Sequence, residues 1–219
     1  DPTNNAAVRS WLYFGNGLAE KEERAAAATA VLAQPPVVDP NTWLALLTVA
    51  KKNQDPTLAR LALAWIQKAE KADGPTIERA GEIGGLLKEM ELKTESMAWC
   101  EAHFPLSPSN WQSSACAQTI WSLLPEKSDA RLAFAKQAME LDSSFFGAYA
   151  SWLADEYLNR RDFPNFQATM AAAVKRRPSR PISGWGMGEY PARSWMEWAL
   201  SDKDISEENK QLIFATVSE

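Results

Sequence analysis

The sequence predicts an all-α protein built from stacked antiparallel helix pairs, and two observations support this class. Apolar residues recur at intervals of three and four along most of the chain, while no segment alternates apolar and polar residues as a half-buried strand does. Helix ends also recur, because four alanines stand four to six residues before a helix breaker, at spacings of 33, 36 and 35: Ala69, Ala102, Ala138 and Ala173. One pair of that length cannot bury its apolar faces alone, so neighbouring pairs must stack.

Turn residues divide the chain into the expected pairs. Glycine and proline clusters end helices, and Asp39 ahead of Pro40 has the form of a helix start, with a capping side chain before proline. In the third pair we expect the helix to be weakened in its middle, at Gly84-Gly85, and to break at Glu91. The first pair is expected to have helices over 6–14 and 18–33, and the helices of the second pair lie on both sides of the turn at 54–56. The third pair runs from about 75 to 103. The fourth runs from 109 to 141, with its turn at Leu124-Pro125.

Residues 143–178 form the fifth pair, and their pattern resembles the tetratricopeptide repeat. The positions at which that family favours Leu, Gly or Ala, Tyr, Asp, an aromatic residue, Ala, Leu and Pro are occupied by Leu153, Ala154, Tyr157, Asp162, Phe163, Ala173, Val174 and Pro178. Two positions depart from the pattern, since Arg161 stands where the family prefers Gly and Phe166 where it prefers Ala. The resemblance covers residues 40–178, and it is good in the second and fifth pairs and poor in the third.

The resemblance implies a right-handed superhelix whose first helices line a concave groove that holds a peptide or a protein element. A non-repeating helical bundle is the alternative. After Pro178 the pattern ends, and the glycine-rich stretch 181–191 is expected to be a loop. Helices over 192–200 and 206–217 then close the end of the stack. We therefore expect one helical-repeat domain over 1–219, with an N-terminal pair over 1–36, a repeat core over 40–178 and a capping region over 179–219.

Charge and hydropathy narrow the classes of partner. The formal net charge of −5 argues against nucleic acid as the main partner, because phosphate binding requires clustered Lys and Arg. The largest basic cluster is local, and it reads either as a helix C-terminus or as a docking patch for an acidic protein surface: Lys175, Arg176, Arg177 and Arg180. No run of 18 apolar residues is present, so no transmembrane segment is expected.

The first residue and the cysteines bear on the compartment. Because the numbering starts at Asp1 without Met, we expect a mature product of a periplasmic or otherwise exported protein, whose targeting segment has been removed. Cys100 and Cys116 are the two cysteines, and they either form one disulfide or remain buried free thiols. Cys100 lies close to the loop between its helix and the next, whereas Cys116 lies about two turns beyond that loop. This stagger works against a bridge.

The sequence gives no positive sign of catalysis. His103 is the single histidine, and with Cys100 it supplies too few ligands for a structural zinc site, so a capping or packing role is expected. Adjacent carboxylates point about 100° apart on a helix and are expected to be solvated: Glu22 and Glu23, Asp155 and Glu156, and Glu207 and Glu208. Gly184, Gly186 and Gly188 lack the preceding strand of a phosphate-binding loop. We expect neither enzyme activity nor a cofactor or metal.

Ten tryptophans form the remaining anomaly of the sequence, and most of them are expected in the core. Trp185 is the exception, because it lies in the glycine-rich segment near Tyr190 and can serve either as an interface anchor or as a cap on the last pair. The family geometry maps Leu47, Lys51, Gln54, Ser151, Asp155, Leu158 and Asn159 onto the groove. Partner binding is assigned to Trp185, Tyr190, Lys51, Asp155, Asn159, Arg176 and Arg177.

These expectations indicate a protein-protein interaction module, and two roles stay open. One is an immunity-type inhibitor that covers a secreted toxin or enzyme, and the other is a scaffold or assembly subunit of an envelope or secretion complex. An acidic inhibitor suits a basic target, because opposite potentials speed encounter. A hydrolase with dispersed carboxylates is the weakest alternative. The identity of the partner and the oligomeric state are not encoded in any visible motif.

Overall fold

The computed structural model describes residues 20–106, 110–141, 146–175 and 189–218, and within these ranges the regular structure is helical, with no strand. The predicted all-α class is therefore confirmed. The chain divides into two compact units, Asp1–Leu123 and Leu124–Glu219. The predicted helix over 6–14 and most of the predicted loop over 181–191 lie outside the described residues. A single domain over 1–219 and a right-handed superhelix stay predictions.

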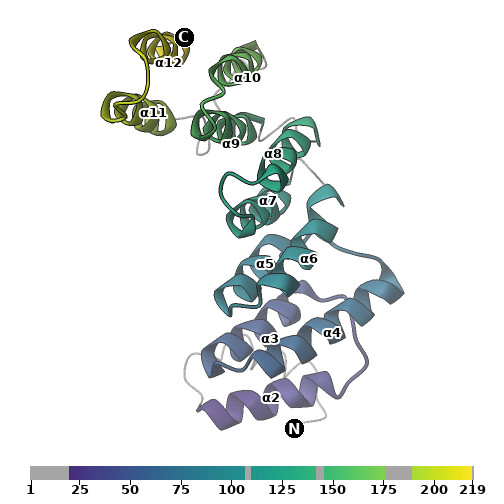
Figure 1. Cartoon of the computed structure of the whole chain (residues 1–219). Coiled ribbons are helices and arrows are strands. Elements are labelled where there is room, and N and C mark those ends of the chain that lie inside the picture. Colours follow the sequence, from purple (N-terminus) through teal and green to yellow (C-terminus); the bar gives the residue numbers. More distant parts are fainter. Residues whose placement is uncertain (1–19, 107–109, 142–145, 176–188, 219) are drawn as a thin grey trace. The chain divides into compact units, whose positions relative to one another are not determined.

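The N-terminal unit, Asp1–Leu123, stacks helix pairs in chain order (Figure 1). Within it α3 packs against α2, α4 and α5, while α5 packs against α6 and α7. First helices of successive pairs therefore lie side by side, as a helical repeat requires. The described helices of this unit are α2 (Lys21–Leu32), α3 (Pro40–Asn53), α4 (Pro56–Asp73), α5 (Ala80–Glu89), α6 (Lys93–His103), the 3₁₀ helix η2 (Phe104–Leu106) and α7 (Trp111–Leu123).

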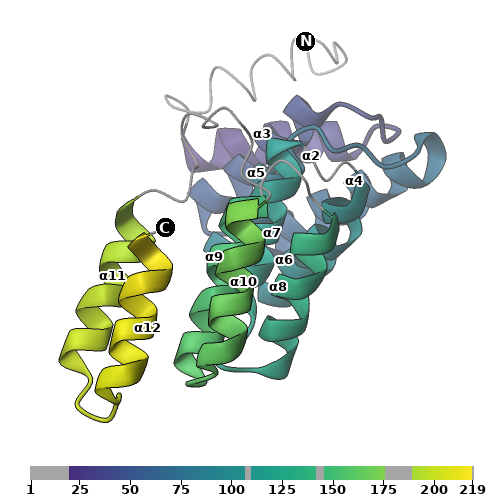
Figure 2. The same cartoon turned by 90° about the horizontal axis from the view of Figure 1, so that it is seen from above.

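The C-terminal unit, Leu124–Glu219, contains α8 (Asp129–Leu141), α9 (Phe146–Asn159), α10 (Phe163–Lys175), α11 (Glu189–Ser201) and α12 (Glu207–Ser218). In it α9 packs against α8 and α10, and α12 packs against α10 and α11 (Figure 2). The helix expected over 192–200 begins earlier, at Glu189. Pro191 lies in its first turn, where the missing N–H of proline costs no hydrogen bond. The last helix is capped as expected, since Ser206 Oγ accepts from the Asn209 N–H at 3.3 Å.

The turns inside three helix pairs share one backbone geometry, which shows that the repeat is structural. Gln54, Glu91 and Arg161 all adopt a left-handed conformation, with φ of 52°, 60° and 60°. The N–H of each following residue bonds a carbonyl five positions back, at 2.9 Å (Asp55 to Ala50), 3.0 Å (Leu92 to Leu87) and 2.8 Å (Asp162 to Tyr157). This is the Schellman arrangement, in which glycine is favoured because it lacks a Cβ. Arg161 thus takes the conformation for which the resembling family uses glycine.

The recurring alanines differ in burial although their spacing is regular. Ala69, Ala138 and Ala173 are buried in α4, α8 and α10, whereas Ala102 is exposed on α6. The buried positions near the end of α6 are instead Cys100 and His103. The spacing therefore marks where second helices end rather than a set of equivalent core sites.

Most of the described tryptophans are buried or half-buried, as predicted. The indole N–H groups of three of them donate to backbone carbonyls: Trp43 to Val37 at 3.0 Å, Trp65 to Gln34 at 2.9 Å and Trp99 to Ala80 at 2.9 Å. A buried indole needs such an acceptor. Trp111 departs from the prediction, because this first residue of α7 is 58% exposed.

The expected softening at Gly84-Gly85 is wrong, since α5 runs unbroken from Ala80 to Glu89. A Cβ on Gly84 would lie 2.2 Å from Cys100 Sγ, and a Cβ on Gly81 would lie 2.4 Å from Ala115 Cβ. Both glycines therefore serve packing, because they let α5 approach α6 and α7 more closely than any larger residue allows. The expected break is found, since α5 ends before Glu91.

Candidate protein-binding face

Two adjacent helices of the N-terminal unit present a continuous set of exposed or half-buried residues, which we call the α3–α5 face. Its members follow helical spacing, so they share one side of each helix. Contacts between the helices tie the set together at both ends, and the middle holds small and apolar groups. The face consists of Asn41, Leu44, Thr48 and Lys51 on α3 and Glu82, Gly85, Leu86 and Glu89 on α5.

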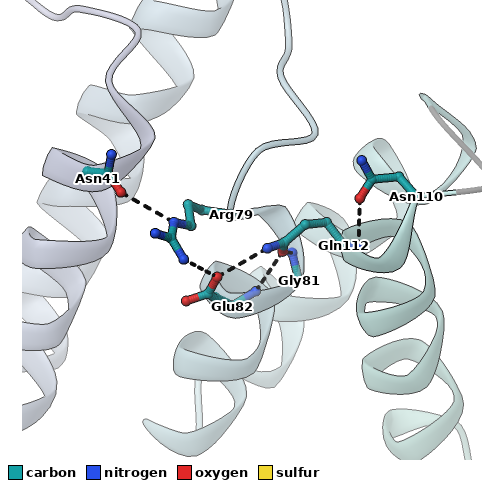
Figure 3. A network of polar contacts seen from close by, with 6 residues as sticks. All are labelled: Asn41, Arg79, Gly81, Glu82, Asn110 and Gln112. Carbon is teal, nitrogen blue, oxygen red and sulfur yellow. Dashed lines mark hydrogen bonds and ion pairs between the residues drawn. The ribbon is translucent and has the colours of Figure 1, made fainter. Parts of the chain in front are cut away.

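At the N-terminal end of these helices, a polar network links α3, α5 and α7 (Figure 3). Arg79 Nε donates to Asn41 Oδ1 at 3.3 Å, and Arg79 Nη1 lies 2.8 Å from Glu82 Oε1. Gln112 Nε2 donates to the same Glu82 oxygen at 3.1 Å. Each side chain thus fixes the position of the next, so the network sets how the first turn of α5 sits against both neighbours.

Gln112 also satisfies the start of α5. The first backbone N–H groups of a helix lack partners inside it, and Arg79, which precedes α5 with a φ of 62°, provides no side-chain cap. Gln112 Oε1 accepts instead from the N–H of Gly81 at 2.8 Å and of Glu82 at 3.4 Å. Since Gln112 is buried, this cap is shielded from water. One helix therefore caps its neighbour.

The other end of the face is closed by exposed contacts. Lys51 on α3 forms an ion pair with Glu89 on α5, and Lys88 Nζ donates to Ser122 Oγ on α7 at 2.7 Å. The Lys51 and Glu89 side chains keep about half of their surface in water. Such exposed pairs contribute roughly 0–1 kcal/mol. A partner can therefore replace them at little energetic cost.

The middle of the face offers apolar surface and open backbone. Thr48 uses its hydroxyl to donate to the Leu44 carbonyl at 2.7 Å within its own helix, which leaves its methyl group for contact. A Cβ placed on Gly85 would meet no atom within 4 Å. The space above Gly85 is therefore open, and the apolar members of the face, Leu44 on α3 and Leu86 on α5, are half-buried.

Of the groove residues expected on or next to α3, some are exposed and one is buried. Lys51 is exposed and belongs to the face, although it is paired with Glu89. Leu47 is fully buried, so its assignment to the groove is wrong. Its place is taken by Leu44 and Thr48, because α3 is rotated so that Leu47 points into the core. Gln54 is exposed but lies past the end of α3.

In the C-terminal unit, the expected groove residues serve mostly internal contacts. Asp155 is exposed, but its Oδ1 accepts from the Trp195 indole N–H at 2.7 Å and so connects α9 to α11. Ser151 Oγ donates to the Gly147 carbonyl at 2.9 Å. Leu158 is buried in a helix that packs against both α8 and α10, which makes its assignment wrong. Asn159 is exposed at the end of α9.

The remaining predicted binding residues fall at the edge of the described structure. Tyr190 belongs to α11 rather than to a loop, and its side chain is outside what is described. Trp185, Arg176 and Arg177 lie wholly outside the described residues. Their role in binding stays a prediction.

Glu156 corrects the expectation that adjacent carboxylates are solvated. It is 1% exposed and lies between two guanidinium groups, 3.4 Å from Arg131 Nε and 3.8 Å from Arg160 Nε. Its neighbour Asp155 points elsewhere, toward Trp195. Glu156 therefore joins α8 to α9 through these two guanidinium groups and does not form an acid/base pair with Asp155.

No group of three or more His, Cys, Asp or Glu side chains that could hold a metal ion is found among the described residues. In the same part of the chain, every helix is too short or too polar to cross a membrane. The free thiols of Cys100 and Cys116 are both buried.

The sequence assigned no role to Arg79, Glu82 or Gln112, and it placed Trp111 in the core. The spacing of Arg79 and Glu82 is visible in the sequence as a possible helical ion pair, but their contact with Gln112 depends on the register between α5 and α7. Trp111 could have been suspected from its place at the very start of a helix, where few neighbours exist to cover an indole.

No protein-family model matches the chain, and no curated protein sequence matches it either. A solved structure titled "Functional Characterization of Pseudomonas Aeruginosa pilF" is similar over 98% of this chain and 90% of that chain, with 14% sequence identity and a TM-score of 0.47. The helical-repeat fold therefore rests on the stacked pairs and their shared turns. Membership of the tetratricopeptide family stays a prediction.

Proposed function

We propose that this chain is a non-catalytic protein-binding module that holds a segment of a partner protein on the α3–α5 face. The observation that carries the proposal is the open space above Gly85, because a helix glycine with free space over it lets another backbone approach closely. Leu44, Thr48 and Leu86 add apolar contact around that point. The face thus has an apolar centre and a polar rim, the usual anatomy of a protein interface.

The charges of the rim specify the kind of segment that fits. Arg79 is paired with Glu82 and Lys51 with Glu89, so each end holds one ion pair, and Lys88, which bonds Ser122, adds a single cation at the second end. A terminal carboxylate or a phosphate would need a cluster of several cations, which this rim lacks. The face suits an internal segment with an apolar residue over Gly85 and polar groups on either side, whose donors and acceptors replace the exposed contact of Lys51 with Glu89.

The proposal extends to the setting and to a second contact region. We place the protein in the bacterial cell envelope, with Trp185, Tyr190, Arg176 and Arg177 as further partner contacts. Its acidic net charge of −5 suits a partner with a basic surface. Such a binder acts as an inhibitor when it covers the working surface of a toxin or enzyme, and as a scaffold when it leaves the partner active.

The test uses one bulky substitution on the face and one off it. Gly85→Trp projects an indole into the space above α5, where a Cβ meets no atom within 4 Å, whereas Ala64→Trp adds the same side chain at an exposed site on α4. Each variant is immobilised and exposed to an extract of the native source, and the retained proteins are identified by mass spectrometry. We expect a protein that the unchanged chain and Ala64→Trp retain but Gly85→Trp loses.

Circular dichroism first establishes that both variants keep the helical fold. If Gly85→Trp folds and still retains the same proteins at the same level, the α3–α5 face is not the binding site. Once a partner is identified, its own activity is measured with and without an excess of this chain. Loss of that activity supports the inhibitor role, and unchanged activity in the complex supports the scaffold.

A further inference from the structure

The two cysteines meet inside the N-terminal unit although they belong to different helices. Cys100 on α6 and Cys116 on α7 are both fully buried, and the Cys100 thiol lies close enough to raise the pKa of the Cys116 thiol. The surroundings of Gly84 place the same helices together independently. A Cβ on this α5 residue would lie 2.2 Å from Cys100 Sγ and 4.0 Å from Cγ2 of Thr119, which stands one turn beyond Cys116 on α7.

The stagger expected from the sequence is removed by η2. This 3₁₀ helix, Phe104–Leu106, continues directly from α6 and carries the chain further before it turns back. Its start is fixed to α7, because Ser113 Oγ donates to the Phe104 carbonyl. The return point thus lies beyond the end of α6, which brings the second turn of α7 level with Cys100. The two thiols therefore lie closer together than the expected stagger indicated.

We propose that Cys100 and Cys116 are a disulfide site, and that they are joined when the chain folds in the presence of a disulfide oxidant. In the first step, one cysteine thiolate attacks the disulfide of the oxidant and forms a mixed disulfide, which releases one thiol of the oxidant. The second cysteine thiolate then attacks the protein sulfur of that mixed disulfide and releases the other. The protein loses two protons and two electrons, and the oxidant is reduced to two thiols.

The environment of the pair sets when this reaction can occur. The hydrogen bond with Cys100, together with burial, raises the pKa of the Cys116 thiol well above its usual range. Because the thiolate is the nucleophile, a protonated and inaccessible thiol reacts slowly. Oxidation therefore occurs while the chain is folding, before α6 packs against α7 and buries the two thiols. Once formed, the bridge is shielded from reductants for the same reason and acts as a lasting clamp between these helices.

The test compares full-length chains refolded under two conditions. One sample refolds from urea in a mixture of oxidised and reduced glutathione, and the other refolds with a strong phosphine reductant. Both are then denatured in N-ethylmaleimide, which labels free thiols, and their intact masses are measured. We expect an unlabelled monomer in the oxidised sample, with a Cys100–Cys116 peptide in a non-reducing digest, and two labels in the reduced sample. Cys116→Ser should take one label, or one glutathione, under oxidising conditions.

A folded monomer that takes two labels after oxidative refolding would overturn the proposal, and so would bridges that form only between two copies. Should the chain fail to refold with glutathione, the reduced folded protein is incubated with the same mixture in mild urea, where α6 and α7 open transiently. A folded product without the bridge again overturns the site. In fully native buffer we expect bridge formation to slow at least tenfold relative to refolding.

Discussion

Nε2 of His103, the last residue of α6, lies 2.8 Å from Oε1 of Glu70 on α4, so one ring connects the second helices of two successive pairs. The other ring nitrogen, Nδ1, lies 2.7 Å from the Trp99 carbonyl, and the ring stacks on the Trp99 indole with centroids 3.8 Å apart. Both ring nitrogens and one face of the imidazole are therefore engaged. The single histidine of the chain serves packing, as its position at a helix end predicted.

Replacing His103 by Ala should destabilise the N-terminal unit. The change removes one of the two partners of the largely buried Glu70 carboxylate, which costs about 1–3 kcal/mol, and loses the stacking on Trp99 as well. The free energy of unfolding from urea titration, followed by tryptophan fluorescence, measures the loss. Glu101→Gln on the exposed side of α6 is the control and should change stability by less than about 0.5 kcal/mol. Equal effects of the two changes would contradict a structural role for His103.

Glu156→Ala should destabilise the C-terminal unit. It removes the carboxylate that the Arg131 and Arg160 guanidinium groups share, and because Arg160 keeps its contacts with Asp129 and the Lys127 carbonyl, the loss should be about 1–3 kcal/mol. Thermal unfolding monitored by circular dichroism should show a clear drop in Tm. Glu207→Ala, at an exposed site in the first turn of α12, is the matched control. A Tm within a degree or two of that control would mean that the buried carboxylate is dispensable.

Adjacent glycines of α5 should respond to alanine with opposite signs. Gly84→Ala places a Cβ 2.2 Å from Cys100 Sγ and should cost about 1–3 kcal/mol through overpacking. Gly85→Ala meets no atom within 4 Å and should stabilise α5 by about 0.5–1 kcal/mol, because alanine is the better helix former. Chemical denaturation of both variants tests the pair. Stabilisation by Gly84→Ala would show that α5 and α6 do not approach as closely as described.

Replacing the residue of a left-handed turn by glycine should stabilise the protein most where the original side chain makes the fewest contacts. Gln54 holds a φ of 52° at an exposed site, and Gln54→Gly should stabilise the protein by about 1 kcal/mol by relieving that conformation. Arg161→Gly relieves the same backbone but loses the contact of the guanidinium with Asp202 at 3.0 Å, so its gain should be smaller. Melting temperatures rank the two variants. A larger gain from Arg161→Gly would imply that its ion pair contributes nothing.

Part of the candidate face was predictable and part was not. Lys51 was expected on the surface of α3 and is found there, because an exposed position at the end of a helix is a local property. Leu47 was expected beside it and is buried, since one helix can present several apolar stripes and only its neighbours decide which is covered. Gly85 was read as a weakness in a helix. Its value as open surface depends on α3, which lies far away in the sequence.

The sequence by itself determined the all-α class, the helix limits in most pairs and the turns between them. These depend on local chemistry: helical periodicity, capping groups such as Asp39 and Ser206, and breaks such as Glu91. Only the tertiary structure decided which side chains meet, including Gln112 with the start of α5 and Cys100 with Cys116. These side-chain contacts depend on the rotation and register of one helix against another. Rotation and register are set by many weak packing contacts across the whole unit rather than by any short stretch of sequence.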